Sequence, residues 1–229
     1  IHNEVNTNQW FSVGCGEGIP CDVNYWVNDY AKNYNSAYDY IKTEQPNAKV
    51  LASFTDQFDT PLDNPNGLHP ILSIKTFLIG FSQIVGSREW QITYHPYSKQ
   101  IFSSEISFYD LPYATLGNTG VVVGWLKQTF PNTPSVWNVQ IAEVGIHSGG
   151  PNPGDGTGGS SEQGQADTLC KAFRNILATP GIESFSYHRM VDHPKEGGLS
   201  LGLRHYDYSI KPSWNIWDSS NKRDSLSCG

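Results

Sequence analysis

The 229-residue sequence has little charge, and the charge that it has is mainly acidic. Only 16% of the residues are charged, with 15 Lys and Arg against 22 Asp and Glu, and the formal net charge is −7. Binding to phosphate backbones or anionic lipids requires clustered basic side chains, so this composition argues against nucleic acid and membrane surfaces as partners. A run of about 18 apolar residues is also missing, so no membrane span is expected.

Aromatic, amide and glycine residues are abundant instead, with 7 Trp, 12 Tyr and 22 Gly. Flat aromatic rings stack on the C–H faces of sugars, while amides both donate and accept the hydrogen bonds that sugar hydroxyls require. The composition therefore suits a neutral carbohydrate as ligand. An ordinary aromatic core explains the aromatic count equally well.

The four cysteines lack the spacing of a zinc site, and the sequence predicts no metal and no cofactor. Cys15 and Cys21 flank a Gly/Pro turn and are placed to form a short disulfide loop. Cys170 and Cys228 could then pair and tie the C-terminal tail to the body; four free thiols are the alternative. An even cysteine count, with little Lys and much Asn and Gly, predicts an oxidising compartment and hence a secreted or extracellular protein.

Strand and helix patterns alternate along the chain, which predicts an α/β fold with a parallel sheet. Helices are expected over 22–44, 68–86, 119–130, 162–179 and 212–219. Strands are expected over 49–54, 91–94, 136–146 and 182–187. Asp22 should cap the first helix and Pro70 should open the second. The glycine-rich stretch 149–159 reads as a loop or a disordered insert between a strand and a helix, so residues 1–229 form one domain.

Two glutamates stand where glycoside hydrolysis needs carboxyl groups. Glu4 follows Asn3, with Trp10 close by, and Glu143 ends an apolar strand pattern. Retaining hydrolysis requires one protonated and one ionised carboxyl roughly 5–5.5 Å apart. A parallel barrel gathers its strand ends at one face, however distant they are in sequence. Each Glu taken alone has an ordinary structural explanation, as a cap or an ion-pair partner.

Together these segments resemble the clan A glycoside hydrolases, which are (β/α)8 TIM barrels. In that clan the acid/base is the Glu of an Asn-Glu pair that ends the fourth strand, and the nucleophile ends the seventh. Counting from Asn3-Glu4 puts Glu143 on the seventh strand, and the sixth then ends in His95-Pro96-Tyr97, similar to the clan's His-x-Tyr element. Further C-terminal motifs resemble a largely uncharacterised barrel family related to this clan: Ile141–Ser148, Glu162–Ala166, Phe185–Pro194, Leu201–Arg204 and Lys211-Pro212.

The resemblance implies a retaining glycosidase that cleaves an extracellular, β-linked poly- or oligosaccharide, with Glu4 as acid/base and Glu143 as nucleophile. Asn3 would bind the sugar 2-hydroxyl, and Tyr97 would orient Glu143. The other substrate-binding candidates are Trp10, His95, His147, Tyr187 and His188. Asp56 is a weaker candidate. Arg189 and Asp192 are expected to form a structural ion pair.

The chain is expected to cover only about strands four to eight, as the C-terminal part of a single catalytic barrel. Strands one to three would be missing from this chain, and because five strands cannot close such a barrel, a second chain could supply the N-terminal half. The alternative function is a carbohydrate-binding or structural protein on a non-catalytic barrel. A metal-dependent hydrolase is a distant third, because the histidines have no ligand spacing.

Overall fold

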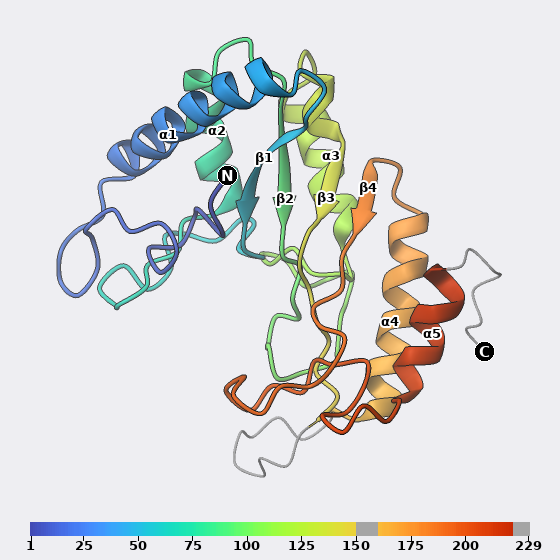
Figure 1. Cartoon of the computed structure of the whole chain (residues 1–229). Coiled ribbons are helices and arrows are strands. Elements are labelled where there is room, and N and C mark those ends of the chain that lie inside the picture. The colour runs from blue at the N-terminus through green and yellow to red at the C-terminus, as the bar shows by residue number, and fades with distance from the viewer. Residues whose placement is uncertain (150–159, 222–229) are drawn as a thin grey trace. The chain divides into compact units, whose positions relative to one another are not determined.

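The computed structural model describes residues 1–149 and 160–221 (Figure 1). The chain divides into two compact units. The first unit contains residues 1–95, 111–113 and 122–140, and the second contains 96–110, 114–121 and 141–229. The strands follow one another in the order β1-β2-β3-β4.

The first unit is built on parallel strands. Strands β1 (Val50–Phe54) and β2 (Trp90–Tyr94) pair in parallel, with Val50 opposite Trp90 and Phe54 opposite Tyr94. Strand β3 (Val139–Ile141) follows β2 in the strand order. All five residues of β2 are buried. A parallel strand buried on both faces is apolar along most of its length, as these strands are.

The N-terminal segment lies along β1. The amine of Ile1 donates to the Leu51 carbonyl at 2.7 Å, and the N–H of Val5 donates to the Ser53 carbonyl at 2.8 Å. The indole N–H of Trp26 in turn donates to the Val5 carbonyl at 2.9 Å. Backbone and side-chain donors therefore hold residues 1–5 next to the carboxyl end of β1, which is where the strand count expects Glu4 to lie.

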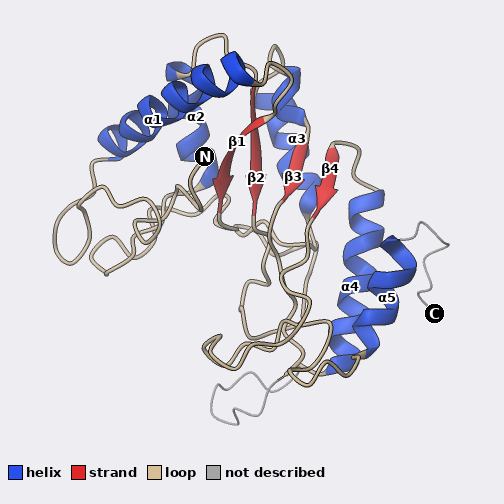
Figure 2. Cartoon of the chain, viewed as in Figure 1, coloured by secondary structure: helices blue, strands red, loops and turns tan. Residues whose placement is uncertain are grey.

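Helices α1 (Val23–Glu44) and α2 (Ile74–Ile84) pack together in the first unit (Figure 2). Between them lies an aromatic cluster in which neighbouring ring centroids are 5.0–6.3 Å apart. Its members are Tyr30, Tyr34, Phe77 and Phe81, and each is fully buried. Much of the aromatic content that suggests sugar binding is therefore ordinary core. Helix α3 (Thr119–Thr129) follows β2 in sequence.

The second unit centres on helices α4 (Glu162–Leu177) and α5 (Pro212–Asn221), which lie side by side (Figure 2). Strand β4 (Ile182–Phe185) precedes a segment that pairs with the last residue of β3 and the chain after it. There the N–H of Ser186 donates to the Ile141 carbonyl and that of His188 to the Val144 carbonyl, each at 2.8 Å. Rings from α4, β4 and α5 meet in a cluster of Phe173, Phe185, Tyr187 and Trp217.

The predicted α/β fold with a parallel sheet is confirmed, and two element boundaries are corrected. The second helix begins at Ile74, not at 68, because Ser73 forms its N-cap and accepts from the N–H of Thr76. The strand expected over 136–146 is confined to β3, because the 3-10 helix Pro134–Trp137 (η1) precedes it. The glycine-rich stretch lies, from residue 150 to 159, outside the described residues.

Cys15 and Cys21 form the predicted disulfide. Cys170 is also disulfide-bonded, and its predicted partner Cys228 lies outside the described residues. None of the described helices is both long and apolar enough to cross a membrane.

Candidate active site

The carboxylate of Glu4 is hydrogen-bonded to the histidine that follows β2. Glu4 Oε1 lies 2.8 Å from His95 Nδ1, and the other ring nitrogen, Nε2, lies 3.3 Å from Ser53 Oγ on β1. The His95 side chain is 3% exposed and that of Glu4 is 16% exposed. Because a partner stands at each ring nitrogen, the imidazole has a fixed orientation and fixes that of the Glu4 carboxylate in turn.

The backbone at Glu4 has a conformation that is uncommon outside glycine, with φ of 39°. Its neighbours determine this geometry. The N–H of Glu4 points to Ser53 Oγ at 3.4 Å, and the fully buried Asn6 pairs with Thr55 through two hydrogen bonds of 2.9 and 3.0 Å. Sequence reasoning did not identify Asn6. In the sequence, Asn6 is marked only by its position two residues after Glu4. Its burial is visible only in the structure.

Asp56 follows β1 and lies in the electrostatic field of Glu4. Burial, with a further contribution from the negative charge of Glu4, raises the pKa of the Asp56 carboxyl to about 7, although a hydrogen bond with its own backbone opposes the shift. Near neutral pH this carboxyl is therefore partly protonated. Such a shift beside another carboxyl group is typical of catalytic sites, so Asp56 is a stronger candidate than its sequence position alone suggests.

Asn3 and Trp10 are exposed, and the Trp10 side chain is 54% accessible to solvent. Trp10 lies on a turn, in which its own backbone N–H donates to the Thr7 carbonyl at 3.3 Å. The adjoining Asn8 side chain donates to the Cys15 carbonyl at 2.9 Å, which attaches this turn to the disulfide loop. An exposed indole on an anchored turn is available to stack on a ligand.

In the second unit, Glu143 accepts a hydrogen bond from Tyr97. The Tyr97 hydroxyl donates to Glu143 Oε1 at 2.9 Å, and both side chains are partly exposed. Glu143 follows the end of β3 by two residues. A donor on one carboxylate oxygen leaves the other oxygen to face a ligand, as the role expected for Tyr97 requires.

The hydroxyl of Tyr187 forms hydrogen bonds with backbone groups of two loops. It accepts from the N–H of Ile146 at 3.1 Å and donates to the Leu201 carbonyl at 3.0 Å, and burial raises its pKa. Gln165, which is fully buried, donates to the Ile146 carbonyl at 2.7 Å and accepts from the Ser213 hydroxyl at 2.6 Å. Tyr187 therefore has only its ring to offer a sugar. Gln165 holds the segment after Glu143 in place.

The two remaining histidine candidates differ in accessibility. His147 is 1% exposed; its Nδ1 accepts from the N–H of Ser200 at 3.1 Å, and its ring meets that of Phe102 edge-on. His188 is partly exposed, and its Nε2 lies 3.2 Å from Glu196 Oε1. His188 is thus open to a ligand, while His147 supports the loop that carries Ser200.

The expected ion pair between Arg189 and Asp192 is wrong. Arg189 binds Glu196 through two nitrogens, each 2.7 Å from a carboxylate oxygen. Asp192 pairs instead with Lys211, whose Nζ lies 2.7 Å from Asp192 Oδ2 and whose side chain is only 1% exposed. Asp192 also accepts from the N–H of Gly202 at 2.8 Å, so both of its oxygens have partners other than Arg189.

The sequence-predicted residues fall into two groups. The first unit holds Asn3, Glu4, Trp10 and His95, and the second holds Tyr97, Glu143, His147, Tyr187 and His188. Within these groups the structure brings together Glu4 with His95, and Glu143 with Tyr97.

A family model described as "Family of unknown function (DUF5722)" matches residues 1–228. No curated protein matches the sequence significantly. Solved structures with a similar fold include a monomeric β-xylosidase from Caulobacter crescentus, with a TM-score of 0.61, 16% identity, and coverage of 96% of this chain and 40% of that one. A β-glucuronidase from Bacteroides uniformis has a TM-score of 0.52 and 15% identity, and the match covers 85% of this chain and 20% of the β-glucuronidase. A family 1 β-glucosidase from Thermotoga maritima has a TM-score of 0.50, 11% identity, and coverage of 90% and 58%.

At these identities the likeness shows the fold alone. The chain shares an α/β fold with glycosidase barrels and spans less than two thirds of the length of each of these three proteins.

Proposed function

The chain belongs to the DUF5722 family of unknown function, and we propose that it is a retaining glycoside hydrolase of the (β/α)8-barrel type. In this proposal Glu4 is the acid/base and Glu143 is the nucleophile, and the substrate is a β-linked extracellular poly- or oligosaccharide. One observation carries it. Each of the two carboxylates has its own hydrogen-bond partner, and these partners, His95 and Tyr97, are two residues apart in the chain.

His95 and Tyr97 stand on either side of Pro96, so the hydrogen-bond partners of the two carboxylates belong to one tripeptide. An extended chain spans at most about 3.3–3.6 Å per residue, so the two Cα atoms are separated by no more than roughly 7 Å. One partner binds Glu4 at 2.8 Å and the other binds Glu143 at 2.9 Å. A double displacement requires both carboxyl groups to act on the same anomeric carbon, and the proposal assigns these two tasks to Glu4 and Glu143.

The chemistry assigns a separate task to each group. Glu4 gives its proton to the departing glycosidic oxygen while Glu143 attacks the anomeric carbon, so that a glycosyl ester forms and the C–O bond breaks. The ionised Glu4 then takes a proton from water, whose oxygen attacks the anomeric carbon and releases Glu143. The hydroxyl of Tyr97 holds Oε1 of Glu143, so Oε2 is the attacking atom.

The disulfides support an extracellular site of action. The Cys15–Cys21 bond and the bonded state of Cys170 require oxidising conditions during folding. Polysaccharides are met outside the cell, so a secreted enzyme fits the proposed substrate class.

Covalent trapping tests the proposal. The protein is incubated with a panel of activated 2-fluoro glycosides, digested, and analysed by mass spectrometry for a glycosylated peptide. We expect label on Glu143, no label in Glu143→Gln, and unchanged label in the control Glu105→Gln, which alters an exposed glutamate of the same unit. Labelling that persists in Glu143→Gln refutes the assignment. Glycan binding without trapping or turnover would instead identify a non-catalytic carbohydrate-binding protein.

A further inference from the structure

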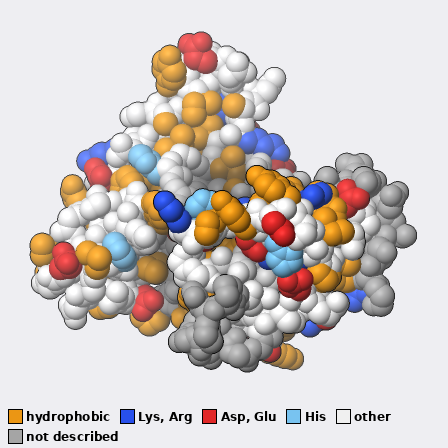
Figure 3. All heavy atoms as spheres, turned by 60° about the horizontal axis from the view of Figure 1, so that its bottom comes forward, with side chains coloured by type: hydrophobic (Ala, Val, Ile, Leu, Met, Phe, Trp, Pro, Cys, Tyr) orange, Lys and Arg blue, Asp and Glu red, His pale blue; other side chains and the backbone are white. Residues whose placement is uncertain are grey.

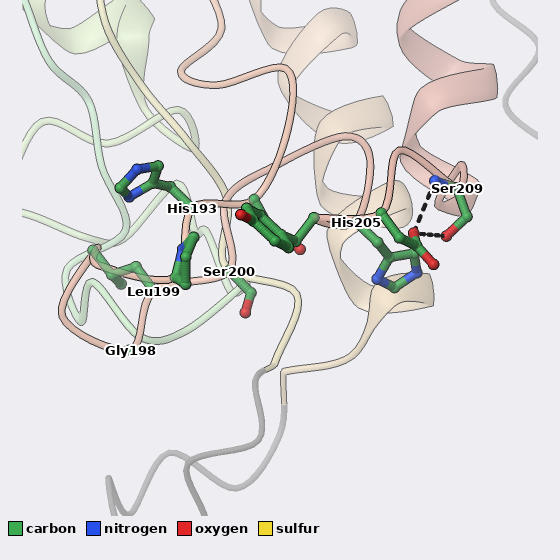
Figure 4. Close-up of a pocket in the computed structure, with 10 residues that line it drawn as sticks. His193, Gly198, Leu199, Ser200, His205 and Ser209 are labelled. Atoms are coloured by element: carbon green, nitrogen blue, oxygen red, sulfur yellow. Dashed lines mark hydrogen bonds between the residues drawn. The ribbon is translucent and has the colours of Figure 1, made fainter.

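The loop between β4 and α5 forms a pocket that the proposed reaction does not use. Its volume is about 700 Å³, within the roughly 300–1,000 Å³ typical of small-molecule sites. Two stretches of the loop, 192–200 and 205–209, supply its lining. Figure 4 shows His193 and Leu199 on one side, and His205 and Ser209 on the other. All the lining residues belong to the second compact unit.

Buried partners hold the walls of this pocket. Asp192 accepts from Lys211 Nζ at 2.7 Å and from the N–H of Gly202 at 2.8 Å. The N–H of Ser200 donates to His147 at 3.1 Å, and the Ser200 carbonyl accepts from the N–H of Ser148 at 3.0 Å. These contacts are made within the protein and order the wall of the pocket, and binding to an ordered wall loses little conformational entropy.

The polar groups of the lining suit the hydroxyls of a sugar. Asp207 Oδ1 accepts from the hydroxyl and the N–H of Ser209 at 2.6 and 3.0 Å, and these bonds hold the pKa of Asp207 below its usual range. Asp207 also lines the pocket. His193 Nδ1 accepts from the N–H of Lys195 at 3.2 Å, so the neutral ring carries its proton on Nε2 and can donate. In Figure 3, histidine and acidic side chains lie next to one another on the surface.

The charge of the lining disfavours an acidic ligand. Among the described residues that line the pocket there is no Lys or Arg, and the cation behind it, Lys211, is already paired with Asp192. A uronic acid or phosphate would meet the Asp207 carboxylate without a cation to offset it. Tyr206, which is 68% exposed, and Leu199 offer apolar surface to the C–H face of a neutral sugar.

We propose that this pocket is a second sugar-binding subsite, which holds a neutral pyranose unit of an oligosaccharide while another unit reacts at Glu143. The choice of ligand class rests on the proposed function, and the preference for neutral over acidic chains goes beyond it. The N–H of Ser148 donates to the Ser200 carbonyl at 3.0 Å, which joins the segment that follows Glu143 to the wall of the pocket.

Calorimetry in the inactive Glu143→Gln background tests the subsite. At pH 8 the protein is titrated with cellohexaose, xylohexaose, mannohexaose and, as acidic counterpart, a hexameric oligogalacturonate. We expect at least one neutral hexasaccharide to bind more tightly than the oligogalacturonate, and Tyr206→Ala to weaken that binding about tenfold. The matched control is Tyr208→Ala, because Tyr208 is 69% exposed in the same loop but does not line the pocket.

Three results would overturn the subsite: tighter binding of the oligogalacturonate, no binding of any neutral hexasaccharide, or equal losses in Tyr206→Ala and Tyr208→Ala. Trapping by a 2-fluoro monosaccharide separates this proposal from the proposed function, because that reagent occupies only the reacting position. The subsite is supported if the Tyr206→Ala variant is still labelled by the 2-fluoro monosaccharide but no longer binds the hexasaccharide. Absence of labelling in the wild type, with binding that depends on Tyr206, refutes the proposed catalysis and leaves the subsite standing.

Discussion

Lys211 is a buried cation, and its removal tests how the loop between β4 and α5 is held. Its side chain is 1% exposed, and its Nζ lies 2.7 Å from Asp192 Oδ2 and 2.9 Å from Ser148 Oγ. The substitution Lys211→Met keeps an unbranched stem but removes the charge. It therefore leaves the Asp192 carboxylate, which is 18% exposed, without its cation.

The expected loss can be worked from this geometry. Removing one partner of a buried ion pair destabilises a protein by about 3–5 kcal/mol, because the other charge stays buried without compensation. Asp192 keeps the hydrogen bond from Gly202 and some exposure to water. We therefore expect the lower end, a loss of about 3 kcal/mol in the free energy of unfolding.

An exposed pair provides the control. Lys75 lies 2.6 Å from Asp59, with exposed fractions of 25% and 53%. Pairs of this kind contribute about 0–1 kcal/mol, so Lys75→Met should reduce stability by no more than about 1 kcal/mol. Both substitutions replace a paired Lys with Met, and the two pairs differ in burial; Lys75 Nζ also lies 4.9 Å from the centroid of the Phe58 ring.

Urea unfolding followed by tryptophan fluorescence measures these differences. The double variant Lys211→Met with Asp192→Asn removes both charges and should recover part of the loss, because no uncompensated carboxylate remains. A loss below about 1 kcal/mol in Lys211→Met would refute the reasoning. So would a double variant that is no more stable than the single one.

Tyr97→Phe removes the donor to Glu143, and we expect turnover of an aryl glycoside to fall about tenfold to a hundredfold, the effect of losing a roughly 1.5–3 kcal/mol hydrogen bond to a charged group. An unchanged kcat would contradict the orienting role. Because burial raises the pKa of Asp56, the stability that its protonated carboxyl contributes is complete below the ordinary pKa of 3.8 and is lost as the pH rises through about 7. Urea midpoints of Asp56→Asn should therefore vary less over this range than those of the wild type, and equal slopes would refute the assignment. Replacing Cys15 and Cys21 with serine opens a loop of sequence separation 6 and should reduce the free energy of unfolding by about 2 kcal/mol in the same assay.

Features that depend on neighbouring residues could be predicted from the sequence. Asp22 precedes α1, and its carboxylate accepts from the N–H of Tyr25 at 3.0 Å, as an N-cap does. Cys15 and Cys21 are separated by a turn that brings them together. The alternation of apolar segments predicted the parallel sheet because each buried strand carries its own signal.

The extent of β3 could not be predicted, because it depends on contacts across the fold. Val136 and Trp137 continue an apolar pattern that reads as strand, yet both lie in η1. The indole of Trp137 donates to the Phe130 carbonyl at 3.0 Å, which holds the chain in a turn beside the end of α3. The apolar pattern of the sequence predicts that Val136 is buried, but it does not predict whether the backbone there is strand or 3-10 helix.

Ion-pair partners in loops could not be predicted from the sequence either. Arg189 is three residues from Asp192, and nearness in sequence suggested a pair. The partner is Glu196, seven residues away. The fold of the loop decides these pairs, since Asp192 lies 2.7 Å from the buried Lys211, which is 19 residues away in the sequence.

The C-terminal motifs that resemble a barrel family prove to hold loops more than to expose reactive groups. Gln165 joins the segment after Glu143 to α5, and Tyr187 joins the same segment to the loop at 201–202. A single sequence cannot separate a residue that reacts from one that positions it, because both are polar and both follow strand ends. This explains why those motifs pointed to a fold and left the sugar open. Tyr206 and Asp207, which line the proposed subsite, lie outside the motifs, so substitutions there would leave the contacts of Gln165 and Tyr187 in place.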